Sequence, residues 1–195
     1  MRVLIVRLGA FGDIVHTLPL AADCVAAGHE VGWLCEDRWA PLIEGSLAVT
    51  TIHRLPRKLL RTAALATRVH ALVSLTRELR AGAYDVAIDA QGLAKSALAT
   101  WLSGAPERLG HARPRAREGA WLATQRRQPL TAVHVIDQQR DLARLLGIVP
   151  VGPWTFPLPR WEIQRTWAGA WLREARLHQP WMLNVGAGWP TKVWP

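Results

Sequence analysis

Short apolar runs alternate along this chain with stretches in which apolar residues recur at helical spacing. Residues 2–8 are mostly apolar and β-branched, as is typical of a strand that is buried on both faces. Strands of similar character are expected at 30–36, 48–55, 84–90 and 106–111, and helices at 13–27, 37–44, 62–80, 95–102 and 134–146. This alternation predicts an α/β fold, a Rossmann-like parallel sheet with helices on both faces.

The clearest helix of the pattern is 62–80. Its apolar residues form a single stripe of the kind that a helix buries against a core. The stripe consists of Leu65, Val69, Leu72, Leu75 and Leu79.

The pattern predicts a domain boundary near position 159. Residues 149–159 contain four prolines and are expected to be a linker. A helix at 161–177 and a strand at 181–185 follow, and the strand leads into the glycines of 186–188. We therefore expect a first domain over 1–159 and the start of a second over 160–195. One helix and one strand do not make a domain, so the sequence is expected to be cut short.

The first strand is followed by a glycine turn and the start of a helix. Gly9–Gly12 separate the strand from Asp13. A strand, a glycine turn and a helix N-terminus form a common anion site, and ligands bind at the carboxyl ends of parallel strands. Asp13 is either a helix N-cap, worth about 1 kcal/mol, or a general base. We expect its replacement to abolish activity at little cost in stability.

Four further places in the chain carry candidate residues. Arg57, Lys58 and Arg61 follow the third strand, where they suit a doubly charged anion or are simply a solvated helix start. Gln91 follows the fourth strand and can bond a hydroxyl group. Arg117 either forms an ion pair with its neighbour Glu118 or clamps a carboxylate of a ligand. His134, at a helix start, is expected from its position alone to have a structural role.

Composition narrows the class of protein only slightly. The chain carries a net charge of +9 with 21 Arg and 3 Lys, which favours nucleic acid, an anionic membrane or a phosphorylated substrate as partner. No apolar run reaches the ~18–20 residues of a membrane span. Cys24 and Cys35 fit neither a metal-binding spacing nor a disulfide framework, so a reducing cytoplasm fits best.

Taken together, four stretches of the chain resemble the lipopolysaccharide heptosyltransferases, and among them the heptosyltransferase I group. The matching strings are MRVLIVRLGAFGDIVHTLP at 1–19, YDVAIDAQGLAKSA at 84–97, AREG at 116–119 and GAGWPTKVWP at 186–195. They occur in order over essentially the whole chain. Gly119 departs from the pattern, in which we expect proline.

The resemblance implies the N-terminal half of a GT-B fold and inverting transfer of heptose from ADP-heptose to a Kdo residue of the lipid A core. It implies no cofactor and no metal. The chain is expected to act in the cytoplasm, peripheral to the inner membrane and weakly associated with its anionic surface, and to bind no nucleic acid. Because most of the donor-binding domain is missing, the chain alone is expected to be inactive.

The resemblance also assigns roles to residues. Asp13 corresponds to the family's catalytic base. The residues that it places at the acceptor are Gly12, Arg57, Lys58, Arg61, Gln91, Arg117 and His134, and those that it places at the donor diphosphate are Thr191 and Lys192.

Two other functions remain open. A dinucleotide-dependent oxidoreductase would use Glu36, at the end of the second strand, to bind a ribose hydroxyl, although the turn lacks the full glycine fingerprint. A non-catalytic remnant that binds anions or glycans would share the composition of an enzyme fragment.

Overall fold

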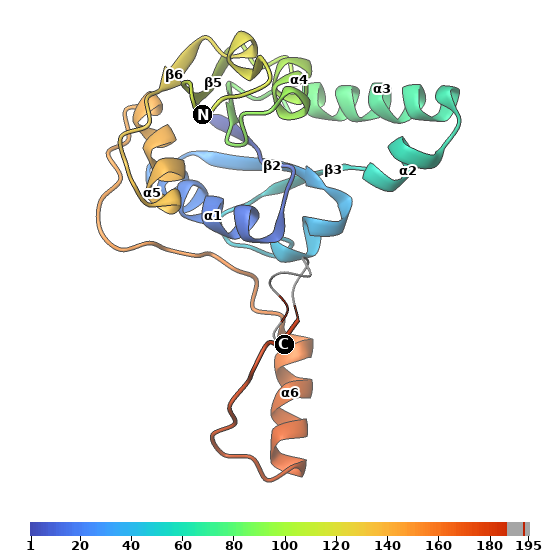
Figure 1. The fold of residues 1–195 in the computed structure, drawn as a ribbon, viewed down its shortest axis with the longest axis vertical. Coiled ribbons are helices and arrows are strands. Elements are labelled where there is room, and N and C mark those ends of the chain that lie inside the picture. The colour runs from blue at the N-terminus through green and yellow to red at the C-terminus, as the bar shows by residue number, and fades with distance from the viewer. Residues whose placement is uncertain (187–192, 194–195) are drawn as a thin grey trace. The chain divides into compact units, whose positions relative to one another are not determined.

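The computed structural model describes residues 1–186 and residue 193. The chain forms two compact units, Met1–Pro159 and Arg160–Pro195, which are described separately (Figure 1). The assignment of acceptor binding to the first unit and donor binding to the second stays a prediction.

The first unit is built on a sheet of six parallel strands in the order β3-β2-β1-β4-β5-β6. Every pair of neighbouring strands is parallel, and β1 lies between β2 and β4. The strands are β1 (Arg2–Val6), β2 (Glu30–Glu36), β3 (Thr51–Leu55), β4 (Val86–Asp89), β5 (Glu107–His111) and β6 (Arg126–Gln128).

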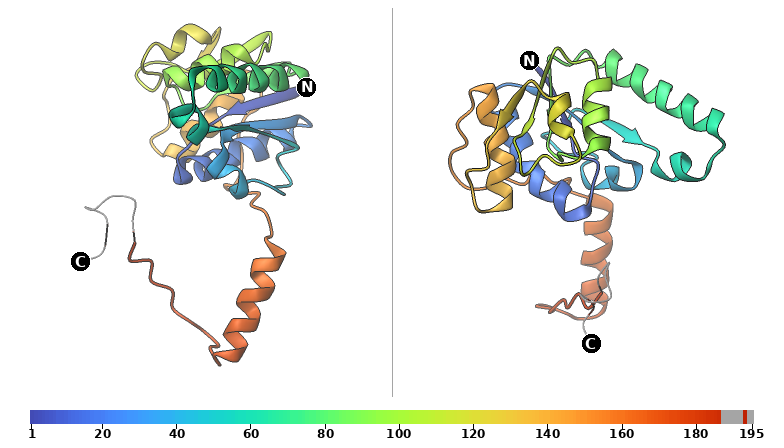
Figure 2. Two further views of the ribbon diagram at one scale, coloured as in Figure 1. Left: turned by 90° about the vertical axis from the view of Figure 1, so that its right-hand side faces the viewer. Right: turned by 45° about the horizontal axis from the view of Figure 1, so that its top comes forward.

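Helices cover both faces of this sheet (Figure 2). Side chains alternate across a strand, so Val3 and Ile5 of β1 join one apolar core while Leu4 and Val6 join the other. The predicted α/β class is therefore confirmed. The helices are α1 (Phe11–Ala26), α2 (Arg57–Thr62), α3 (Leu65–Ala81), α4 (Ala94–Leu102) and α5 (Val135–Arg140), with 3₁₀ helices η1 (Asp37–Leu42), η2 (Ala120–Ala123) and η3 (Asp141–Leu146).

The expected helix 62–80 differs most from the prediction. The chain forms α2 and α3 instead, and only Leu75 and Leu79 of the predicted stripe are buried. Leu65, Val69 and Leu72 are exposed, because the sheet and α4 cover only the part of α3 nearer its C-terminus. Figure 1 shows the other end of α3 extending away from the sheet towards α2.

Two strand predictions were also inaccurate. The third strand starts at Thr51 rather than at position 48, and β6 lies in a stretch where the apolar pattern predicts no strand. The sequence of β6 is RRQ, a short polar segment at the edge of the sheet, so hydrophobic periodicity carries no signal for it.

The second unit contains one helix, α6 (Glu162–Glu174), in its described residues. The predicted strand at 181–185 is wrong, since residues 181–186 form no regular structure. A strand takes its hydrogen bonds from a neighbouring strand, and the described residues of this unit contain no second strand.

Candidate functional site

The sheet reverses its strand order at β1, which neighbours both β2 and β4. In open α/β sheets, ligands bind outside the carboxyl ends of the strands at such a switch point. Two side chains fix the loops there. The Gln91 Oε1 atom accepts a hydrogen bond from the Leu8 amide at 2.9 Å, which ties the loop after β4 to that after β1. The buried Asp89 carboxylate accepts from the amides of Gln91 and Gly92 at 3.0 and 2.9 Å.

Asp13 lies at this switch point, in the first turn of α1. The helix begins at Phe11, so Asp13 is its third residue rather than the predicted N-cap, which is Ala10. The carboxylate still caps the helix, because its Oδ2 atom accepts from the Ala10 amide at 3.1 Å. Asp13 therefore caps the helix from its third residue, and its role as a general base stays a prediction.

Asp13 also pairs with Arg7, the first residue after β1. The distance between Arg7 Nη2 and Asp13 Oδ2 is 2.6 Å. The Asp13 side chain is 43% exposed, whereas that of Arg7 is only 5% exposed. Both bonds of the carboxylate use Oδ2, and Oδ1 has no hydrogen-bond partner among the described residues. The carboxylate is thus held by one oxygen and offers the other to solvent or to a ligand.

Arg7 is a residue of the candidate site that was not predicted from the sequence. Its Nη1 donates to the Ala90 carbonyl at 2.7 Å, so it connects the loops after β1 and β4. Burial lowers the pKa of Arg7 from its usual value, and the ion pair with Asp13 opposes that shift. The sequence does carry one sign of the importance of Arg7, a single cation at the end of a buried apolar strand. An unpaired charge is costly there, so such a cation needs a partner.

The glycine turn is shorter than predicted. Gly12 already belongs to the first turn of α1, and its φ angle is not in the left-handed region. Gly9 is the position at which a side chain would not fit, because a Cβ atom there would lie 2.7 Å from the indole nitrogen of Trp39.

A buried carboxylate organises a group of cations beside this site. Glu36, the last residue of β2, is 4% exposed. Its Oε2 atom lies 3.1 Å from Arg38 Nε and 3.0 Å from Arg57 Nη1, and its Oε1 atom lies 3.3 Å from Lys95 Nζ. Because both oxygens are occupied by cations, Glu36 is not free to bind a ribose hydroxyl. This geometry counts against the dinucleotide-dependent oxidoreductase.

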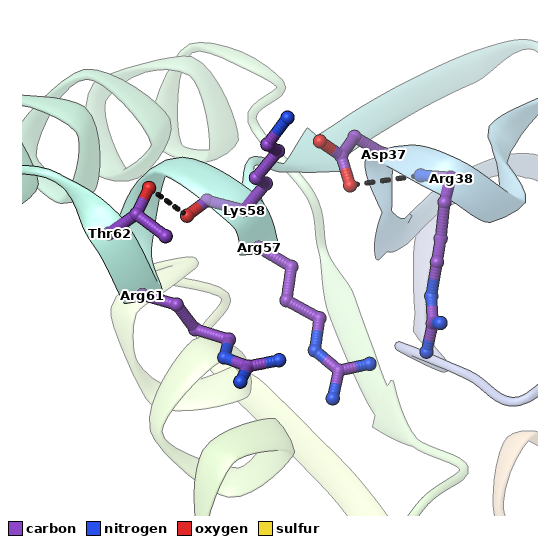
Figure 3. A pocket seen from close by; sticks show the side chains of 6 residues that line it. All are labelled: Asp37, Arg38, Arg57, Lys58, Arg61 and Thr62. Carbon is purple, nitrogen blue, oxygen red and sulfur yellow. Dashed lines mark hydrogen bonds between the residues drawn. The ribbon is translucent and has the colours of Figure 1, made fainter.

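The predicted cations after β3 line a hollow of about 710 Å³. Figure 3 shows the guanidinium groups of Arg38, Arg57 and Arg61 pointing the same way, whereas the Lys58 ammonium points in the opposite direction. The structure therefore brings Arg57 and Arg61 together as expected, adds Arg38, and places the Lys58 charge apart from them. The six lining residues are Asp37, Arg38, Arg57, Lys58, Arg61 and Thr62.

Arg117 is attached to the same edge of the sheet through its backbone. Its amide donates to the Gly92 carbonyl at 2.8 Å. Within the described residues Arg117 forms no ion pair with Glu118, whose carboxylate instead accepts from the Ala94 amide at 3.1 Å at the start of α4. The exposed Arg117 side chain is therefore available to a ligand.

His134 has a structural role and lines a different hollow. It is the N-cap of α5, where its Nδ1 atom accepts from the Ile136 amide at 3.3 Å. Its ring stacks on that of Trp154 with a centroid distance of 4.4 Å. The hollow that it lines also contains Asp137 and Arg140 and shares no residue with that of Arg57.

The predicted donor residues Thr191 and Lys192 lie outside the described residues. In the part that is described, no group of three or more His, Cys, Asp or Glu side chains could hold a metal ion. Over the same residues, none of the helices combines the length and the apolar character needed to cross a bilayer.

A comparison of the sequence with family models identifies the family. The model described as "Glycosyltransferase family 9 (heptosyltransferase)" matches residues 72–195. The chain belongs to glycosyltransferase family 9. Lipopolysaccharide heptosyltransferase 1 of Pseudomonas aeruginosa is 30% identical over 207 residues, a match that covers 100% of this chain and 55% of the relative. The protein of the same name from Escherichia coli K12 is 38% identical over 100 residues, 50% of this chain and 31% of the relative.

Solved structures agree with this assignment. The E. coli heptosyltransferase WaaC with ADP matches with a TM-score of 0.72 and 29% identity, over 80% of this chain and 51% of that one. A family 9 glycosyltransferase from Veillonella parvula matches at 0.78 and 18% identity, over 100% of this chain and 56% of that one, which shows the shared fold. The chain thus spans about half the length of these glycosyltransferases.

Proposed function

We propose that this chain is the acceptor-binding part of a lipopolysaccharide heptosyltransferase, which moves heptose from ADP-heptose to a Kdo residue of the inner core with inversion at the anomeric carbon. The observation that carries the proposal is the Asp13 carboxylate at the switch point of the sheet, with one oxygen held by Arg7 and the Ala10 amide and the other free. Support for the substrates comes from the two relatives named for lipopolysaccharide heptose transfer and from a structure of WaaC with ADP-2-deoxy-2-fluoro heptose.

In the proposed reaction, Asp13 acts as general base through Oδ1. It takes the proton of a Kdo hydroxyl as the hydroxyl oxygen attacks the anomeric carbon of the heptose. The bond between that carbon and the diphosphate oxygen breaks, and ADP leaves with the electron pair. A positioned base contributes about 10²–10⁴-fold to the rate. Arg7 fixes the position of the carboxylate without touching the substrate.

The cations around Glu36 bind the anionic groups of the acceptor. Arg57 and Arg61 point the same way into the hollow after β3, and guanidinium groups match carboxylates and phosphates with two parallel hydrogen bonds. Glu36 holds Arg57 in position before the acceptor arrives, which lowers the entropy lost on binding. Gln91, Gly12 and Arg117 complete the acceptor side, and Lys58 contributes its charge at a distance.

The donor diphosphate is assigned to Thr191 and Lys192, so residues 1–159 form the acceptor side and 160–195 begin the donor side. The acceptor is a lipid, Kdo-lipid A, and the enzyme therefore works at the cytoplasmic surface of the inner membrane. Weak attraction of the basic chain to anionic lipid headgroups would keep it close to that substrate.

Acceptor binding can be tested on the chain itself. Titration calorimetry with a deacylated, water-soluble Kdo oligosaccharide should show binding that weakens at least tenfold in the Arg57→Gln/Arg61→Gln variant. Arg126→Gln, which removes an exposed charge paired with Glu107, is the matched control and should bind normally. Equal affinity in all three proteins would refute the proposed acceptor site.

Transfer can be tested in a chimera. Residues 1–159 would replace the corresponding part of the P. aeruginosa relative, and release of ADP would be measured with ADP-heptose and the same acceptor. We expect turnover that falls at least about 100-fold on Asp13→Asn substitution. An Asp13→Asn chimera that keeps turnover within tenfold of its parent would show that Asp13 is only a cap.

A further inference from the structure

The exposed half of the α3 stripe leaves an apolar surface uncovered. Leu65 is 72% exposed and Val69 51% exposed, and Leu72 and Val73 are also exposed. These positions are spaced at three or four residues or are adjacent, so they lie on one side of α3. Two shallow hollows follow the helix here, and both are lined by Val69, Val73 and Arg77. A contiguous exposed apolar patch of this kind marks an interaction surface.

Cations surround this apolar stripe. Over α2 and α3, from Arg57 to Ala81, there are six Lys or Arg residues and one acidic residue, Glu78. The Glu78 carboxylate is bonded to His53 Nδ1 at 2.6 Å, which ties it to β3. Arg68 and Arg77 are exposed and make no ion pair among the described residues. An apolar helix face bordered by basic residues can contact both the acyl-chain boundary and the anionic headgroups of a bilayer.

We propose that α2 and α3 together, residues 57–81, dock this protein onto an anionic lipid bilayer. The choice of a bilayer rests on the proposed function, in which the acceptor is a lipid. Charge supports the same choice, because a second copy placed face to face would bring two cationic segments together in a protein of net charge +9. A bilayer with anionic headgroups supplies both an apolar phase for Leu65 and Val69 and the opposite charge for Arg68 and Arg77.

This surface is continuous with the proposed acceptor site. Arg57 and Arg61 of α2 line the hollow, and α3 starts three residues after α2 ends. Docking through α3 would therefore hold the acceptor hollow close to the headgroup layer. A lipid-linked sugar could then reach Arg57 and Arg61 while its acyl chains stay in the membrane.

Flotation of the whole chain with vesicles tests the proposal without any sugar acceptor. Vesicles of 30 mol% phosphatidylglycerol in phosphatidylcholine should carry the protein, and vesicles of phosphatidylcholine alone should not. The Leu65→Ser/Val69→Ser variant should bind at least about tenfold more weakly. Arg68→Gln/Arg77→Gln should bind the anionic vesicles about 25-fold more weakly, at roughly fivefold for each charge near the surface.

Matched controls separate the surface from general effects. Leu47→Ser removes a leucine that is 88% exposed elsewhere, and Arg54→Gln/Arg126→Gln removes two exposed charges outside the segment. Both should bind vesicles within about threefold of the parent chain. Equal binding by the α3 variants and these controls would overturn the proposal, as would failure of the parent chain to bind anionic vesicles.

If a second copy of the chain covers this surface, sedimentation velocity should show a dimer, and the Leu65→Ser/Val69→Ser variant should be monomeric. This result would also overturn the proposal. The outcome is independent of heptose transfer. Vesicle binding with no affinity for the soluble Kdo oligosaccharide would refute the acceptor site alone. Affinity for the oligosaccharide with no vesicle binding would refute the docking surface alone.

Discussion

The ion pair between Arg7 and Asp13 makes the proposed base a structural residue as well. The sequence predicts that replacing Asp13 costs little stability, whereas the structure places a guanidinium that is 5% exposed against its carboxylate. The perturbation that measures this is a double-mutant cycle with Asp13→Asn, Arg7→Met and both together. Such a cycle isolates the interaction of the pair from the separate costs of each substitution.

The two single substitutions should differ, because the partners differ in burial. Asp13→Asn removes the negative charge that faces the buried Arg7 guanidinium, whose other hydrogen bond goes to the Ala90 carbonyl at 2.7 Å, and we expect a loss of about 3 kcal/mol in the free energy of unfolding. Arg7→Met leaves a carboxylate that is 43% exposed and can be hydrated, and it adds apolar surface to a buried position. We expect that variant to lose about 1 kcal/mol.

The double variant should lose about 2 kcal/mol, which gives a coupling energy of about 2 kcal/mol (three plus one minus two). Urea unfolding followed by far-ultraviolet circular dichroism would measure all four proteins, with a common denaturant slope as the check that the unfolded states are alike. A coupling below about 0.5 kcal/mol, or a greater loss for Arg7→Met than for Asp13→Asn, would refute this description of the pair.

Three further outcomes are expected. Glu36→Gln should weaken binding of the soluble Kdo oligosaccharide about tenfold in calorimetry, because the cations of the hollow lose their fixed positions; unchanged affinity would contradict this. Burial lowers the pKa of His111 to about 4 from an unfolded value of about 6.5. The unfolded chain therefore binds the extra proton, and the stability of the wild-type protein falls by up to about 3 kcal/mol as pH drops from 6.5 to 4. His111→Gln should remove that part of the loss in urea unfolding at each pH, and a stability curve parallel to that of the wild type would refute it. Gly92→Ala should cost about 2 kcal/mol in the free energy of unfolding, since the φ of Gly92 is +74° and a Cβ would lie 3.1 Å from the Arg115 carbonyl oxygen. Gly147→Ala, at φ +79° with no atom within 4 Å of a Cβ, should cost only about 1 kcal/mol in urea unfolding. Equal losses would show that the close contact at Gly92 costs nothing.

The order of strands and helices could be predicted because the inner strands of a parallel sheet are continuous apolar runs. The limits of β2, Glu30–Glu36, agree with the predicted residues 30–36. Prediction failed where the local pattern does not decide the structure. β6 is polar, and α3 carries a regular apolar stripe of which the tertiary structure buries only the part around Leu75 and Leu79. Periodicity shows that a face is apolar but does not show what covers it.

The candidate site was predictable in its positions but not in its pairings. Asp13, Arg57 and Gln91 each follow a strand, and a parallel sheet brings the carboxyl ends of its strands to one edge. The partners come from elsewhere in the chain. Lys95 is 59 residues from Glu36, and the Ala90 carbonyl that binds Arg7 is 83 residues away. Contacts at such separations leave no trace in local spacing, so the pairings of Lys95 with Glu36 and of Arg7 with the Ala90 carbonyl were found only in the structure.

Two carboxylates near the carboxyl ends of neighbouring strands differ in what they can do. Glu36 is the last residue of β2, Asp13 lies in the first turn of the helix that follows β1, and each is paired with arginine. Glu36 is 4% exposed and has cations on both oxygens, so its carboxylate is not accessible to a substrate hydroxyl and serves to position Arg57 and Arg38. Asp13 is 43% exposed and its bonds use one oxygen alone. The unoccupied, accessible oxygen, rather than charge or position after a strand, is what identifies Asp13 as the candidate base.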